Sequence, residues 1–155
     1  DRMDKLVVAD IAARAYTPQH GPIFDALRDV RPQQATTREE VRDQLASQLG
    51  SDPVLVPFLM KGLPRQREGG FSWRFNVPVL QQSLEEVVGS GDLSVNALPA
   101  LFIRGSESDY VGDDDLERLQ EHFLHMNDHV ISGAGHWLHA QAPEEFYAVT
   151  SDFLG

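Results

Sequence analysis

In the segment "HVISGAGHWLHAQAPEEF", residues 129–146, an apolar run leads through paired glycines to His136. The run "HVISG" is short and apolar, as expected for a strand buried on both faces of a parallel sheet. Gly133 and Gly135 allow a sharp exit that aims His136 at one point in space. The following "APEEFYAVTSDFL" predicts a helix with Pro143 in its first turn. A strand therefore delivers a histidine at its carboxyl end and leads into a helix.

Two further runs have the same character, "KLVVAD" at residues 5–10 and "ALFIRG" at 100–105. Between the second and third runs, "GDDDLERLQEHFLHM" predicts a helix with an acidic first turn and with Leu116, Leu119 and Phe123 at helical spacing. Alternating strands and helices are typical of an α/β fold with a mostly parallel sheet. The sequence assigns 1–12 and 99–155 to this core.

Residues 13–98 interrupt the alternation with helical patterns. Thr37 and Glu40 form a capping-box pattern ahead of a helix that Gly50 closes, and Ser51-Asp52-Pro53 opens another. A third helix is expected in "VPVLQQSLEEVVG", residues 77–89. The insert is much longer than the dozen or so residues of an ordinary crossover between parallel strands. Segments of this length commonly cover a site, so we expect a helical cap or lid.

Charge and composition exclude several classes of partner and chemistry. The formal net charge is −11, from 24 acidic and 13 basic residues, which opposes binding to nucleic acid or an anionic membrane. Cysteine is absent, so thiol nucleophiles and thiolate metal sites are excluded. No apolar run reaches the roughly 18 residues of a membrane span and no signal-peptide pattern is present, so a cytoplasmic protein is expected. His122, His125 and His129 match no strong ligand spacing; neither a metal nor an organic cofactor is expected.

Four polar residues follow the predicted strands: Asp10, Ser108, Asp109 and His136. Ligands of parallel sheets bind beyond the carboxyl ends of the strands. Histidine, carboxylate and hydroxyl together are typical of nucleophilic acyl transfer, in which the imidazole moves the proton and the carboxylate fixes its tautomer. The attacking hydroxyl is the missing part, because the chain has no G-x-S-x-G elbow; "VGSGD" at 88–92 and "RGSES" at 104–108 lack its spacing.

Several segments carry a family resemblance: "VADIAARAY", "FLMKGL", "FSWRFNVPVL", "LFIRGSESDYV" and "GAGHWLHAQAPEEF". In this order they resemble the small serine esterases of the α/β-hydrolase fold, in particular the YbfF-type branch. The resemblance implies that the chain is the C-terminal part of such an enzyme, with the cap and the catalytic histidine. The nucleophile would lie on an N-terminal half of the same hydrolase, which becomes the expected partner. The isolated chain is then expected to be inactive, and the substrate to be a small-molecule ester or thioester with a small to medium acyl group.

The resemblance also implies roles for individual residues. His136 would be the general base, Asp10 the carboxylate that orients it, and Ser108 an auxiliary hydrogen-bonding residue. Many α/β-hydrolases instead place the acid in a G-x-x-D pattern, which counted from Gly105 ends on Ser108. Asp109 follows one residue late, and such a displacement turns a side chain in an extended segment to the opposite face, so Asp109 is the alternative acid.

Aromatic and polar residues near these segments are candidates for substrate binding. They are Trp137 and Tyr110 in the core, and Phe58, Trp73, Arg74 and Asn76 in the insert. Arg74 and Asn76 would serve equally well to tie the cap to the sheet, and Trp137 to pack locally. Two other functions stay open at this point. One is a different α/β-hydrolase reaction, on a lipid or a carbon–carbon bond, and the other is a noncatalytic half that binds a partner or acts as a scaffold.

Overall fold

The computed structural model describes residues 3–51, 53–89 and 93–155, and they form two compact units. The sheet unit comprises the described residues of 1–15 and 90–155, and the helical unit is Tyr16–Gly89. The expected insert, residues 13–98, begins three residues earlier and ends nine residues later than this helical unit, so the assignment of core and cap stays a prediction. Each unit has its own hydrophobic core and is described by itself.

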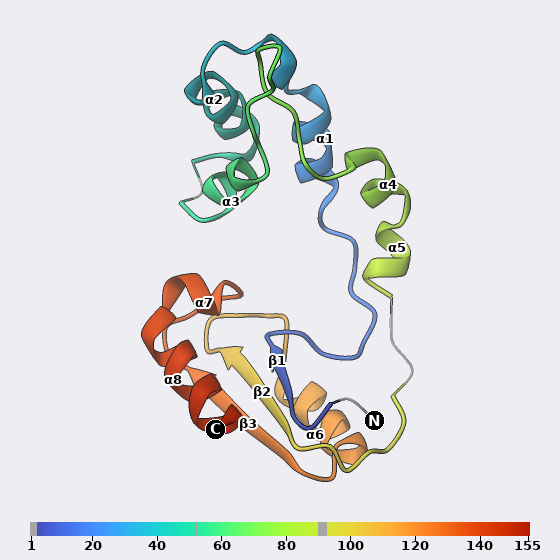
Figure 1. The fold of residues 1–155 in the computed structure, drawn as a ribbon. Helices are drawn as coiled ribbons and strands as arrows, with labels where there is room; N and C mark the ends of the chain where they lie inside the picture. Colours follow the sequence, from blue (N-terminus) through green and yellow to red (C-terminus); the bar gives the residue numbers. More distant parts are fainter. Residues whose placement is uncertain (1–2, 52, 90–92) are drawn as a thin grey trace. The chain divides into compact units, whose positions relative to one another are not determined.

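The sheet unit is built on three parallel strands in the order β1-β2-β3 (Figure 1). They are β1 (Leu6–Ala9), β2 (Ala100–Gly105) and β3 (Met126–Ile131). The central strand β2 is almost entirely buried and has the bounds that its apolar run predicts. β3 begins three residues before its apolar run, because the backbone of 126–128 pairs with β2 although Asn127 and Asp128 are exposed. Pairing at an edge uses backbone groups and leaves little signal in the side chains.

Helices cover both faces of this sheet, as alternate residues of each strand point to opposite sides. On one face, α6 (Asp113–His122) packs its Leu116 and Leu119 against Phe102. On the other, α7 (Leu138–Gln141) and α8 (Pro143–Leu154) pack against Leu101 and Ile103. This three-layer α/β arrangement confirms the predicted fold class. Two details differ: α6 ends before Phe123, which is extended but still buried, and α7 was not predicted.

The helical unit contains five α-helices among its described residues. They are α1 (Gly21–Asp29), α2 (Arg38–Leu49), α3 (Leu55–Lys61), α4 (Val77–Gln82) and α5 (Leu84–Val87), with a 3-10 turn at Pro32–Gln34. The capping box predicted for α2 is half formed. The Thr37 hydroxyl accepts from the Glu40 N–H at 3.2 Å, whereas the Glu40 carboxylate accepts from the N–H of Thr36 instead of Thr37. Gly50, with φ of 76°, ends the helix as expected.

Two expectations for the helical unit need correction. The single helix predicted within residues 77–89 divides at Ser83 into α4 and α5, and its apolar residues Leu80 and Val87 are exposed. The second expectation is that a helix begins at Ser51-Asp52-Pro53. α3 begins at Leu55, and Asp52 lies outside the described residues. None of the helices in the described ranges is both long enough and apolar enough to cross a bilayer.

Candidate active site

Asp10 is the residue that directly follows β1, and its backbone continues the sheet. Its N–H donates to the carbonyl of Ile103 at 2.7 Å, and its side chain is almost completely buried, with 1% exposed. Its φ is 50°, in the left-handed region that residues other than glycine rarely adopt, and among the described non-glycine residues it alone has a positive φ. Backbone strain of this kind costs about 1–3 kcal/mol and is typical of functional sites.

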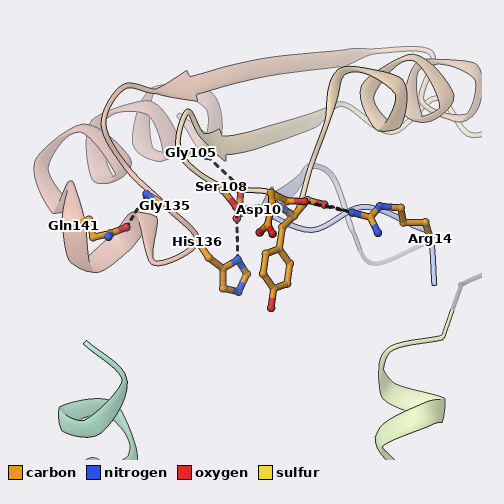
Figure 2. Close-up of polar contacts among 9 residues, drawn as sticks. Asp10, Arg14, Gly105, Ser108, Gly135, His136 and Gln141 are labelled. Carbon is orange, nitrogen blue, oxygen red and sulfur yellow. Dashed lines mark hydrogen bonds and ion pairs between the residues drawn. The ribbon is translucent and has the colours of Figure 1, made fainter. Parts of the chain in front are cut away.

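The Asp10 carboxylate accepts three hydrogen bonds from residues at the ends of the other strands (Figure 2). The Gly105 N–H donates to Oδ1 at 3.2 Å, while the Ser108 hydroxyl and His136 Nδ1, at 2.8 Å, both contact Oδ2. These donors offset the cost of burying a carboxylate. An ionised carboxylate only accepts, so against it Nδ1 of His136 is the donor, and Nε2 of a neutral imidazole then keeps its lone pair. The imidazole is thereby held in the tautomer that a general base requires.

The loop after β2 is fixed by hydrogen bonds around Ser108. The Ser108 hydroxyl donates to Asp10 and accepts from the Tyr110 N–H at 3.2 Å, so both of its roles are defined. Arg14, four residues after Asp10, pairs with Asp115 at 3.2 Å and donates from Nη2 to the Tyr110 carbonyl at 3.2 Å. The loop that carries Ser108 is therefore tied to the segment that carries Asp10.

The loop that carries His136 is held against the end of β2 and against α7. The Gly133 N–H donates to the Ser106 hydroxyl at 2.8 Å, and the Gly135 N–H donates to Gln141 Oε1 at 2.9 Å. Gly133 has a φ of 72°, which explains the need for glycine there. Gly105 meets the same loop so closely that a Cβ added to it would lie 2.2 Å from the Ala134 carbonyl oxygen.

Aromatic rings flank the imidazole of His136. The Tyr110 ring is stacked on it, with a centroid distance of 3.8 Å and an interplanar angle of 15°. Trp137 approaches at 6.0 Å with its plane inclined by 68°. The His136 side chain is 38% exposed in the part of the chain that the structure describes.

The structure separates the two carboxylates that the sequence left as candidates. Asp10 contacts His136 directly, whereas the side chain of Asp109 is exposed. The backbone carbonyl of Asp109 accepts a long hydrogen bond of 3.5 Å from Arg14. The geometry thus brings together Asp10, Ser108 and His136, as the sequence expects. Their catalytic roles stay a proposal.

The four candidate residues of the insert lie in the helical unit. Trp73 donates from Nε1 to the Leu27 carbonyl at 3.3 Å and stacks on Phe75, and so contributes to the packing of this unit. Asn76 caps α4 by accepting from the Val79 N–H at 3.4 Å. Phe58 and Arg74 are exposed. Contact of any of these residues with substrate stays a prediction.

Sequence reasoning missed several residues that support the site. One is Gly105, whose position at the end of a buried strand is a sequence signal for a close backbone contact. Ser106, Arg14 and Gln141 carry no local signal, because their partners are distant in sequence. Of the three histidines considered as metal ligands, His129 pairs with Glu145 at 3.0 Å, and the described ranges hold no cluster of three metal-ligating side chains.

Comparison with known proteins relates this geometry to a family. No protein-family model matches the chain. Esterase YbfF of Escherichia coli is 39% identical over 145 residues, which cover 93% of this chain and 55% of the relative. The sn-1-specific diacylglycerol lipase ABHD11 of Danio rerio is 31% identical over 160 residues, covering 98% and 50% respectively. A solved structure named a marine microorganism esterase superposes with a TM-score of 0.91 at 34% identity, covering 99% of this chain and 61% of that one.

The chain spans about half the length of the curated relatives that it matches. The similarity extends over nearly all of its own residues and includes both the sheet unit and the helical unit. The parallel strands with helices on both faces agree with the fold of the matched structures. The chain therefore has the α/β-hydrolase fold and is a homologue of esterases of that fold.

Proposed function

We propose that this chain is part of a serine hydrolase that cleaves carboxylic esters or acyl thioesters with small to medium acyl groups. The observation that carries the proposal is the contact of His136 Nδ1 with the buried carboxylate of Asp10, at the carboxyl ends of parallel strands. This contact holds the proton on Nδ1 and leaves Nε2 as the base. The names of the E. coli esterase and the zebrafish lipase support ester hydrolysis as the reaction class.

In the proposed mechanism, a serine hydroxyl from outside this chain attacks the acyl carbonyl while His136 Nε2 takes its proton. His136 then returns that proton to the departing alkoxide or thiolate, which leaves an acyl-serine. Water hydrolyses the acyl-serine with His136 again acting as base. Asp10 stabilises the imidazolium in both halves of the reaction, and Ser108 holds the Asp10 carboxylate in place.

The edges of the sheet support a nucleophile on a further segment of the protein. Among the described residues β1 pairs only with β2, yet all four of its residues are apolar and the first three are partly buried. The opposite edge strand β3 instead carries exposed Asn127 and Asp128, which discourage further pairing. We infer that the N-terminal half of the hydrolase pairs with β1 and supplies the serine elbow, and that the helical unit acts as the cap.

The zebrafish relative favours a second substrate class. Its name specifies diacylglycerol, so a neutral lipid with an sn-1 acyl ester is the alternative substrate for the same proposed triad. Competition between diacylglycerol and a short p-nitrophenyl ester would rank the two substrates for one enzyme.

Ester hydrolysis by reconstituted protein tests the proposal. We expect this chain to hydrolyse p-nitrophenyl butyrate only together with the N-terminal half, and His136→Gln to remove that activity. Asp109→Gln, at an exposed site, is the matched control and should keep it. Activity of the chain by itself, or full activity of His136→Gln in the assembled protein, would contradict the proposed mechanism. An assembled, folded protein that lacks any ester hydrolysis would favour a noncatalytic role.

A further inference from the structure

The contact between Tyr110 and His136 is closer and flatter than ordinary aromatic packing. The two ring centroids are 3.8 Å apart and the planes are inclined by 15°, whereas aromatic pairs in proteins commonly lie about 4.5–7 Å apart. The rings therefore lie face to face over most of their area. Trp137, which meets the same imidazole at 6.0 Å and 68°, provides no comparable face.

We propose that Tyr110 is a positioning residue, whose ring fixes the plane of the His136 imidazole. The hydrogen bond from Nδ1 to Asp10 fixes one nitrogen of the imidazole, while changes in the χ1 and χ2 torsions can still tilt the ring around that nitrogen. Turning would swing Nε2, the atom that moves the proton in the proposed mechanism, away from the reacting oxygen. A flat ring held against one face removes this freedom. The inference rests on the proposed function, because it assigns Tyr110 a part in that same reaction.

Tyr110 can serve as such a support because it is itself held in place. Its N–H donates to the Ser108 hydroxyl at 3.2 Å, and its carbonyl accepts from Arg14 Nη2 at 3.2 Å. Its side chain also packs against the hydrophobic cluster between the sheet and α6. These contacts set the position of the ring from the same loop that places Ser108 on Asp10.

The proposal also explains why the support is aromatic. The face of a tyrosine ring carries negative potential and interacts favourably with a cation. His136 becomes an imidazolium while it holds the serine proton, with the Asp10 carboxylate at Nδ1 and the Tyr110 face beside it. An aliphatic side chain of similar volume would fill the space without this interaction. Phenylalanine would retain both the flat face and the potential.

Kinetics of two variants in the assembled enzyme separate positioning from substrate binding. We expect Tyr110→Leu to lower kcat about 10- to 100-fold at nearly unchanged KM for p-nitrophenyl butyrate, and Tyr110→Phe, which keeps the ring, to retain clearly more activity than Tyr110→Leu. The reason is that a misaimed base slows proton transfer without weakening ground-state binding. If Tyr110→Leu instead raised KM and left kcat unchanged, Tyr110 would contact substrate and the proposal would be wrong.

Proton NMR of His136 provides a readout that does not depend on activity. The Tyr110 ring current should shift the His136 ring protons upfield in the wild type and in Tyr110→Phe, and the shift should vanish in Tyr110→Leu. If Tyr110→Leu does not fold, Tyr110→Met removes the ring with a more adaptable side chain. Unshifted His136 protons in the wild type would overturn the inference. Because this signal exists whether or not the enzyme cleaves esters, its loss is distinguishable from failure of the proposed function.

Discussion

Gly105 offers a demanding test, because one added methyl group should displace the histidine loop without touching the histidine. A Cβ at position 105 would lie 2.2 Å from the carbonyl oxygen of Ala134 and 2.6 Å from that of Gly135. Cβ contacts under 3.0 Å essentially never occur, so these backbone atoms must move away from the end of β2. Both belong to the segment that leads into His136. The same residue also donates from its N–H to Asp10, so the acid is disturbed together with the base.

The expected effects follow from the size of that displacement. The Ala134 oxygen must retreat from 2.2 Å to at least 3.0 Å. A misplacement approaching 1 Å in a catalytic group costs about 100-fold in rate. Crowding a tightly packed position costs about 1–3 kcal/mol of folding free energy. We therefore expect Gly105→Ala to lower kcat for p-nitrophenyl butyrate about 100-fold and to reduce the free energy of unfolding by a few kcal/mol.

Gly135→Ala is the matched control, because it adds the same methyl group to the same loop. Its Cβ would lie 3.5 Å from Gln141 Oε1 and 3.7 Å from Nε2, which are ordinary contacts with the flexible end of a side chain. We expect kcat within about twofold of the wild type. Steady-state kinetics and urea denaturation of the assembled protein measure both quantities. Wild-type kcat and stability of Gly105→Ala, or a larger loss in Gly135→Ala, would show that the close contact at Gly105 does not position the His136 loop.

Three further substitutions test other parts of the account. Asp10→Asn should lower kcat about 10⁴-fold, because an amide can donate to Nδ1 and favour the wrong tautomer, while Asp109→Asn should be nearly neutral; the reverse ranking would return the role of acid to Asp109. Lys5→Met removes hydrogen bonds from Nζ to the carbonyls of Phe153 and Leu154 at the end of α8, at 2.6 and 3.0 Å. It should reduce the free energy of unfolding by about 0.3–1 kcal/mol in urea denaturation, and an unchanged value would show that this contact does not stabilise α8. Thr37→Ala removes the N-cap of α2 and should reduce the free energy of unfolding by about 1 kcal/mol in the same measurement. Thr36→Ala, one residue before the N-cap, is the control.

The sequence predicted most reliably those elements in which the polarity of the side chains matches their burial. β2 is buried on both faces, so its apolar run coincides with the strand. β3 is an edge strand, and its first residues pair through their backbone while their polar side chains are exposed, so its start was misplaced. The division of α4 from α5 at Ser83 leaves no mark in the spacing of apolar residues.

Some residues of the candidate site could likewise be predicted from the sequence, and others could not. Asp10 and His136 could be singled out because each follows an apolar strand, and parallel strands bring their carboxyl ends to one edge. The conformation of the loop at 105–112 determines how Tyr110 stacks on His136 and how Arg14 forms its hydrogen bond to the Tyr110 carbonyl. Turn geometry of this kind brings distant residues together without any periodic pattern. The left-handed φ of Asp10 was equally hidden, because nothing in the sequence indicates it.

In the proposed mechanism, His136 and Asp10 serve a serine that lies outside this chain. The most direct measurement is to label the assembled protein with a fluorophosphonate and to locate the modified residue by mass spectrometry of its peptides. We expect a single labelled serine in the N-terminal half, with labelling suppressed by His136→Gln. A fluorophosphonate adduct on a serine within residues 1–155, such as Ser106 or Ser108, would contradict it.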